Sequence, residues 1–206
     1  MLITHLTSCV IKKRKRYWVF NMKFLFIIGG SGSGKTSLAK MLQENNPDRF
    51  KFIKGTTTRP RREEETDDDY EFISEEQYDA DLENKLFIGQ SIHVMSPNKY
   101  GYRKTLLDSE KTNILIVSIE GFLNAVHERT LHDTMSLCYI NSDKPFVDRE
   151  NRDFSAEDRF NKGVLSAFIR ENGDETALYI NSRVIKLTAI KKENIQRYYE
   201  QLTNIK

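Results

Sequence analysis

Short apolar runs alternate along the chain with segments whose apolar positions recur at helical spacing. The apolar runs are 23–29, 49–53, 113–119, 135–140 and 177–181. The segments with helical spacing are 36–45, 75–85, 121–131, 155–171 and 191–205. Strands that are apolar throughout and are separated by helices indicate a parallel sheet covered on both faces. The pattern therefore predicts an α/β fold with a parallel sheet of about five strands flanked by helices.

Residues of about 54–112 interrupt this alternation. They contain a run of charged residues, one amphipathic helix and the apolar run 86–94, which is consistent with a strand. Insertions of this kind are natural places for a substrate site, because loops on a rigid scaffold tolerate insertion and carry function. We therefore expect a small substrate-binding lobe that stands on the main sheet.

The first 21 residues differ from the rest of the chain. The basic run 12–16, "KKRKR", followed by an apolar run, imitates a signal peptide and also a nuclear-import or nucleic-acid patch. The apolar run leads straight into a glycine-rich loop that requires a strand before it, and it is shorter than the roughly 20 residues that span a bilayer. We expect 1–21 to be an extension without function, either disordered or a non-native start. Residues 22–206 are then a single domain.

Composition narrows the class of protein further. A chain of 206 residues can bury one real core, and twelve Phe with nine Tyr exclude a wholly disordered chain. The formal net charge of +2 gives no argument for a nucleic acid or a membrane as partner. Cys9 and Cys138 match no metal-binding spacing and suit a reducing compartment, with Cys138 in the core. We expect a cytoplasmic monomer or homodimer.

The segment 29–36, "GGSGSGKT", fits the phosphate-loop pattern G-x-x-x-x-G-K-[ST], with a predicted strand before it and a helix after it. Glycines let backbone N–H groups surround phosphate oxygens, and the helix start adds its positive end. Lys35 supplies a positive charge to the outer phosphates, and the Thr36 hydroxyl can ligate Mg²⁺. We predict a site for ATP with Mg²⁺. Its residues are Gly29, Gly30, Ser31, Gly32, Ser33, Gly34, Lys35, Thr36 and Ser37.

A phosphate loop serves either hydrolysis or transfer to an acceptor. The guanine-reading N-K-x-D element of GTPase switches is absent, and the acidic strand end of large ATPases is at best weakly matched by Glu120. A small domain with an inserted lobe favours transfer to an acceptor.

The run from Arg59 to Glu71 places ten charged side chains in thirteen positions, three basic ones first and seven acidic ones after them. Charge clustered in this way is usually solvated surface. Taken alone, the run does not indicate a site.

Three segments in this order, "GGSGSGKTSL", "TTTRPRREEETDDDYEFIS" and "KYGYRK", resemble the guanylate kinase family of nucleoside monophosphate kinases. Members of that family show a phosphate loop followed by the pattern T-T-R-x-P-R-x-x-E, and then D-Y-x-F. The resemblance covers 23–206 in order and is specific in its first half. It implies transfer of phosphate from ATP to a nucleoside monophosphate, with GMP or dGMP as the family default.

The resemblance also implies roles for residues around the charged run. Arg59 and Arg61 would clamp the acceptor phosphate, as arginine forks do bidentately. Tyr70 and Tyr100 would donate hydrogen bonds to the same phosphate, and Glu64 would accept from the amino edge of the base. Tyr102 and Glu120 complete the predicted acceptor-binding set. On this interpretation the basic half of the run belongs to the acceptor site, and the acidic half lies mainly on the protein surface.

The chain also departs from the family pattern. One residue is missing between the first arginine and the proline, which leaves open which of Arg59, Arg61 and Arg62 fills each place. Gly89 stands where the family has a second base-reading glutamate, and Tyr102 where it has a serine that reads guanine. Buried hydrogen bonds discriminate strongly between substrates, so such changes should alter base preference.

A lid at about 143–160 is similar to the family's and carries three arginines predicted as catalytic. These are Arg149, Arg152 and Arg159. Positive charge brought over the transferring phosphate stabilises the transition state, and closure excludes water. The segment 177–182, "ALYINS", resembles the family's strand end near the adenine. Asn181 in this segment would help to hold that base.

Three alternatives remain open at this point. The first is a kinase of another or modified (deoxy)nucleotide, or of a sugar phosphate such as ribose bisphosphate, which Gly89 and Tyr102 favour. The second is a non-catalytic guanylate-kinase-like binding module, against which Lys35 and Thr36 argue. The third is a kinase of nucleic-acid 5′ ends or bases, although we expect small-molecule nucleotides as the partners.

Overall fold

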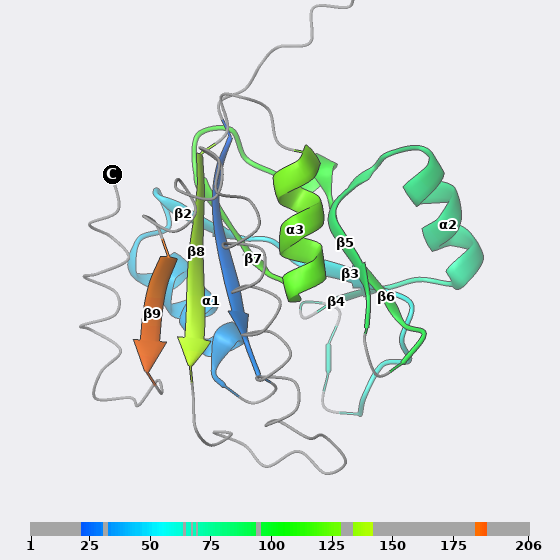
Figure 1. Cartoon of the computed structure of the whole chain (residues 1–206), viewed down its shortest axis with the longest axis horizontal. Coiled ribbons are helices and arrows are strands. Elements are labelled where there is room, and N and C mark those ends of the chain that lie inside the picture. Colours follow the sequence, from blue (N-terminus) through cyan, green and yellow to red (C-terminus); the bar gives the residue numbers. More distant parts are fainter. Residues whose placement is uncertain are drawn as a thin grey trace, which may run out of the picture.

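The computed structural model describes residues 22–30, 33–63, 65, 66, 68, 70–93, 96–128, 134–141 and 184–188 (Figure 1). Its larger sheet has the strand order β2-β7-β1-β8-β9, and every neighbouring pair is parallel. The strands are β1 (Lys23–Gly29), β2 (Phe50–Phe52), β7 (Thr112–Ile116), β8 (Thr134–Asn141) and β9 (Val184–Thr188). The predicted α/β fold with a parallel sheet is confirmed.

Strand β1 is apolar from Phe24 to Ile28, and both of its faces are buried there. Phe24, Phe26 and Ile28 pack in one core with helix α3 (Ile119–Glu128). Leu25 and Ile27 pack in a second core with helix α1 (Lys35–Asn45). Successive side chains of a strand point to opposite faces, so this one strand supplies both cores and fixes the position of the loop that follows it.

The run predicted as a strand over 113–119 ends earlier than its apolar residues suggest. Strand β7 stops at Ile116, and α3 begins at Ile119. The Ser118 hydroxyl accepts a hydrogen bond from the Gly121 N–H at 3.1 Å, which is the bond of a helix N-cap. The expected strand at 177–181 and the helices at 155–171 and 191–205 lie outside the described residues.

A smaller sheet forms within the predicted insertion and has the order β4-β3-β6-β5. Its elements are β3 (Gly55–Thr57), β4 (Tyr70–Phe72), α2 (Glu75–Glu83), β5 (Phe87–Ile92), β6 (Lys99–Arg103) and the 3₁₀ turn η1 (Lys104–Leu106). Figure 1 shows α3 standing between the two sheets and α2 on the outer side of the smaller one. The smaller sheet therefore lies beside the main sheet, with α3 as the support between them.

A bulge in β5 forms the contact with α3. Ile88 pairs with Tyr102 and Ser91 with Tyr100, so two residues of β5 lie opposite one residue of β6. The first of the two is Gly89, whose φ of 64° is a conformation that glycine favours. A Cβ at Gly121 of α3 would lie only 2.7 Å from the Gly89 carbonyl oxygen. Helix and bulge therefore meet backbone to backbone.

Expectations about Cys138, the first 21 residues and the lid remain to be compared with the structure. Cys138 is fully buried in β8, as predicted for a core residue, and burial raises the pKa of its thiol to about 12. Across the described parts of the chain, no helix is long and apolar enough to span a membrane. The predicted extension 1–21 and the predicted lid lie outside the described residues.

Candidate functional site

The phosphate loop connects the carboxyl end of β1 to the start of α1. Gly34 is the N-cap of α1 and has a left-handed backbone with φ 89°. The Lys35 ammonium donates hydrogen bonds to the carbonyl oxygens of Gly29 and Gly30, each at 2.7 Å. Thr36 and Ser37 are exposed in the first turn of the helix. The strand, loop and helix context expected for a nucleotide site is present, while Ser31 and Gly32 lie outside the described residues.

Several features of this loop fit a bound triphosphate. Gly34 offers no side chain to cap the first turn of α1, so an anion can accept hydrogen bonds from the N–H groups there. The Ser33 side chain is only 1% exposed, yet its hydroxyl has no hydrogen-bond partner in the described part of the chain. The Thr36 hydroxyl, exposed beside Lys35, suits a cation that also binds phosphate oxygens.

Four of the seven predicted acceptor residues gather on one face of the smaller sheet. The Arg59 guanidinium carbon lies 5.0 Å from the ring centroid of Tyr70 and 5.3 Å from that of Phe72. Tyr70 and Tyr100 meet edge to face at 6.4 Å between centroids. The Arg61 guanidinium carbon also lies over Phe72, 5.0 Å from its ring centroid. Four side chains expected to bind one phosphate are thus assembled together.

The opposite face of the smaller sheet is tied to α2. Arg103 donates from Nε to Glu71 at 2.5 Å and forms an ion pair with Asp81 at 2.8 Å. The Thr56 hydroxyl donates to the same Glu71 carboxylate at 2.7 Å. Because side chains alternate along a strand, this network fixes the orientation of Tyr70 and Phe72 on the other face.

Arg59 is the most buried of the three arginines in the charged run. Its side chain is 7% exposed, and its two terminal nitrogens donate to the two carboxylate oxygens of Glu65, at 2.6 and 2.5 Å. Burial alone would lower the pKa of the Arg59 guanidinium, but the bonds to Glu65 outweigh it and raise that pKa. The pKa of Glu65 is lowered, because its bonds to Arg59 and to the Arg62 backbone outweigh its burial.

Glu65 is a member of the Arg59 cluster that the sequence pattern does not indicate. The charge pattern predicts a solvated residue here, but its side chain is only 12% exposed and also accepts from the Arg62 N–H at 3.1 Å. The spacing of charged residues in the run is the signal that could have identified Glu65. Arg59, Arg62 and Glu65 follow one another at intervals of three, the same intervals as in the family pattern R-x-x-R-x-x-E. Glu64, the residue predicted to read the base, lies outside the described residues.

Comparison with known proteins decides the family. The guanylate kinase family model matches residues 21–163, which is more than half of the chain. The chain belongs to the guanylate kinase family. The guanylate kinase of Helicobacter pylori is 30% identical over 151 residues, which cover 71% of this chain and 66% of that protein. The guanylate kinase of Mycoplasma mobile is 35% identical over 124 residues, 56% of this chain and 61% of that protein. The chain thus spans slightly less than two thirds of these relatives' length.

The fold agrees with this membership. A crystal structure of guanylate kinase from Anaplasma phagocytophilum superimposes with a TM-score of 0.55 at 18% identity. The match covers 89% of this chain and 83% of that one.

Two of the departures from the guanylate kinase pattern, at Gly89 and Tyr102, have structural explanations. Tyr102 is 5% exposed and belongs to the main core, and its hydroxyl donates to the Ile116 carbonyl at the end of β7. Burial raises its pKa well above the ordinary value. Gly89 forms the bulge against α3, where a side chain would strain the backbone. Tyr102 and Gly89 therefore join the smaller sheet to the core, and a role of Tyr102 in acceptor binding stays a prediction.

Glu120 lies in the first turn of α3 and is exposed. One of its carboxylate oxygens accepts from the Ile92 N–H, at the end of β5, at 3.3 Å. Glu120 therefore lies at the rim of the smaller sheet. Its role, and those of Arg149, Arg152, Arg159 and Asn181, which lie outside the described residues, stay predictions.

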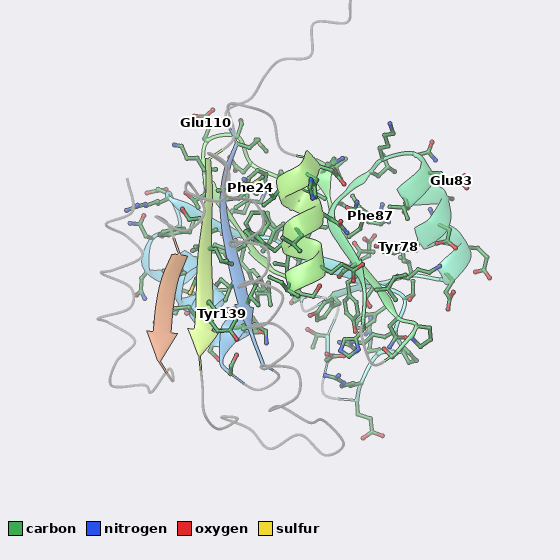
Figure 2. The ribbon with its side chains drawn as sticks, viewed as in Figure 1. Phe24, Tyr78, Glu83, Phe87, Glu110 and Tyr139 are labelled. Atoms are coloured by element: carbon green, nitrogen blue, oxygen red, sulfur yellow. The ribbon has the colours of Figure 1, made fainter. Side chains whose placement is uncertain are left out.

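Tyr78 of α2 holds the strand that carries Tyr100. Its hydroxyl donates to the Tyr100 carbonyl at 2.6 Å, and its ring stacks on Phe87 at 4.7 Å between centroids (Figure 2). Replacing Tyr78 with phenylalanine should lower the free energy of unfolding by about 1–2 kcal/mol, because a part-buried carbonyl loses its donor. It should also raise KM for the acceptor without changing KM for ATP. Urea unfolding and steady-state kinetics measure the two effects.

The matched control is Asp79→Asn, a neighbouring position on α2 whose carboxylate forms an exposed ion pair with Lys99 at 2.7 Å. Exposed pairs contribute little, so this variant should unfold like the wild type. Equal stability of Tyr78→Phe and wild type would contradict a bracing role for the Tyr78 hydroxyl.

Proposed function

We propose that this protein transfers the γ-phosphoryl group of ATP to the phosphate of a nucleoside monophosphate, with GMP or dGMP as the acceptor. One observation carries the proposal. A phosphate loop with its lysine and an arginine–tyrosine cluster on the inserted sheet occur together in a chain of the guanylate kinase family.

The chemistry requires no covalent intermediate. An oxygen of the acceptor phosphate attacks the γ-phosphorus in line, and ADP leaves. Lys35 neutralises charge on the outer phosphates of ATP, while Arg59 and Arg61, with Tyr70 and Tyr100, hold the acceptor phosphate. Positioning and neutralisation of charge supply most of the acceleration in such reactions.

Mg²⁺ would be held by the Thr36 hydroxyl and would add positive charge where the transferred phosphate is most negative. Within the described segments, no group of three or more His, Cys, Asp or Glu could hold a metal ion. We further propose that the arginines of 143–160 close over the transferred group, that Asn181 contacts the adenine, and that the protein works in the cytoplasm on small-molecule nucleotides.

The acceptor can be identified by measuring ADP release with MgATP against GMP, dGMP, AMP, CMP, UMP, dTMP and ribose bisphosphate. We expect GMP or dGMP to give the highest kcat/KM. Preference for another acceptor would contradict the assignment to guanine and would make Gly89 and Tyr102 the positions that change specificity. No turnover with any acceptor, while MgATP still raises the unfolding temperature, would instead indicate a binding module.

A further inference from the structure

Glu65 fills the arginine fork to which the acceptor phosphate is assigned. Both terminal nitrogens of Arg59 bond to the Glu65 carboxylate, one to each oxygen, at 2.6 and 2.5 Å. A third bond runs from the Arg59 guanidinium to the Pro60 carbonyl at 2.9 Å. Arginine binds carboxylates and phosphates with the same planar, two-bond geometry. The carboxylate therefore occupies the position that a phosphate would take on this guanidinium.

The surroundings of this ion pair are those of a binding site. The two side chains are 7% and 12% exposed, and the guanidinium lies against the rings of Tyr70 and Phe72. A surface ion pair would be weakened by water and salt, whereas a pair in this environment is screened much less. Arg59 is thus kept in place and bonded on the aromatic face of the smaller sheet.

A phosphate and Glu65 cannot share the fork. A phosphate monoester carries up to two negative charges at neutral pH, and a carboxylate beside it on one guanidinium would repel it. Glu65 has other donors close by, because the Arg62 N–H is 3.1 Å from Oε2 and the Arg62 guanidinium is 3.7 Å from Oε1. The carboxylate can therefore leave Arg59 without becoming an unpaired charge.

We propose that Glu65 is an internal substitute for the acceptor phosphate, which occupies the Arg59 fork until the phosphate of the substrate displaces it. The inference rests on the proposed function, since it concerns the same acceptor site. Glu65 then sets the affinity of the clamp: it keeps the arginine oriented when no acceptor is bound, and it competes with every phosphate that arrives. The apparent dissociation constant of the acceptor is raised in inverse proportion to the fraction of time that the fork is free of Glu65.

The test is to titrate ribose 5-phosphate and GMP, each without ATP, into the wild type and the Glu65→Gln variant. Ribose 5-phosphate has the phosphate monoester but no base, so it reports on the clamp alone. Glutamine removes the charge but can still accept one hydrogen bond from Arg59. We expect ribose 5-phosphate to bind the variant about threefold to tenfold more tightly, measured by calorimetry. Glu63→Gln is the matched control, because Glu63 is exposed in the same loop and the charge change is the same.

Each outcome decides a different point. Tighter binding by Glu65→Gln, with Glu63→Gln like the wild type, supports the competition. Equal or weaker binding by Glu65→Gln overturns the inference while leaving the kinase proposal intact. If the wild type binds neither GMP nor ribose 5-phosphate, the acceptor site itself is wrong, and the proposed function fails with it.

A measurement on the wild type covers the case in which the variant does not fold. The carboxylate carbon of Glu65, followed by NMR in protein labelled at glutamate, should shift when ribose 5-phosphate is added, because the carboxylate leaves the Arg59 fork. An unchanged resonance at saturating ribose 5-phosphate would overturn the displacement.

Discussion

Replacing Lys35 with alanine should lower kcat for phosphoryl transfer about a thousandfold, the magnitude seen when one charge-stabilising group is removed from an active site. The Lys35 ammonium is held at the phosphate loop by the carbonyl oxygens of Gly29 and Gly30, each at 2.7 Å. A bound triphosphate is expected to draw it to the phosphate oxygens, where its charge is needed in the transition state. The measurement is ADP release at saturating MgATP and GMP, together with the unfolding temperature.

Lys40→Ala is the control for this prediction, because Lys40 lies on the same helix and is exposed. It should keep the activity of the wild type. Because Lys35 is not a core residue, Lys35→Ala should unfold at nearly the same temperature as the wild type. A Lys35→Ala variant that kept most of its kcat would contradict a catalytic role for the phosphate loop, and the proposed function with it.

Replacing Gly121 with valine should lower the free energy of unfolding by about 3 kcal/mol, the upper part of the range for overpacked sites. Even a Cβ at Gly121 would lie 2.7 Å from the Gly89 carbonyl oxygen and 3.5 Å from the Gly89 carbonyl carbon. These are backbone atoms of the β5 bulge, and they cannot rotate away as a side chain would. The next carbonyl, that of Gln90, is bonded to the Asn124 side chain at 2.8 Å, which limits the retreat of the strand.

Urea unfolding measures this loss, and His127→Val separates it from the effect of a β-branched residue in a helix, since His127 is exposed on α3. KM for the acceptor should rise in Gly121→Val as well, because β5 pairs with the strand that carries Tyr100. If Gly121→Val were as stable as His127→Val, α3 and β5 would have to be farther apart than the structure places them.

The contact of α3 with the smaller sheet also bears on the choice of base. Gly89 and Tyr102, which stand where relatives are expected to have base-reading residues, are used here to attach the smaller sheet to the core. Guanine recognition in this chain would have to rely on other groups, of which Glu64 is the one predicted to read the base. The acceptor screen therefore tests whether a guanylate kinase family pocket can read guanine without the glutamate and the serine that the family pattern has at the positions of Gly89 and Tyr102.

The charged run shows how far composition can mislead. Its acidic half was expected to be mainly solvated, yet Glu65 is nearly buried and bonded to two arginines. A charge run is usually surface because isolated charges lose hydration on burial. Here each buried charge has a partner within the run, and the partner is set by the path of the loop, which a local pattern does not contain.

The sequence by itself determined the parts of this protein whose structure depends on neighbouring residues. Strand β1, the phosphate loop and α1 follow from an apolar run, a spacing of glycines and a helical repeat, all within residues 23–45. Only the tertiary structure decided the bulge at Gly89, the burial of Tyr102 against Ile116 and the filling of the Arg59 fork by Glu65. Each of these depends on which backbone or side chain arrives from elsewhere in the chain or around a loop, and burial with its electrostatic consequences exists only once those groups have met.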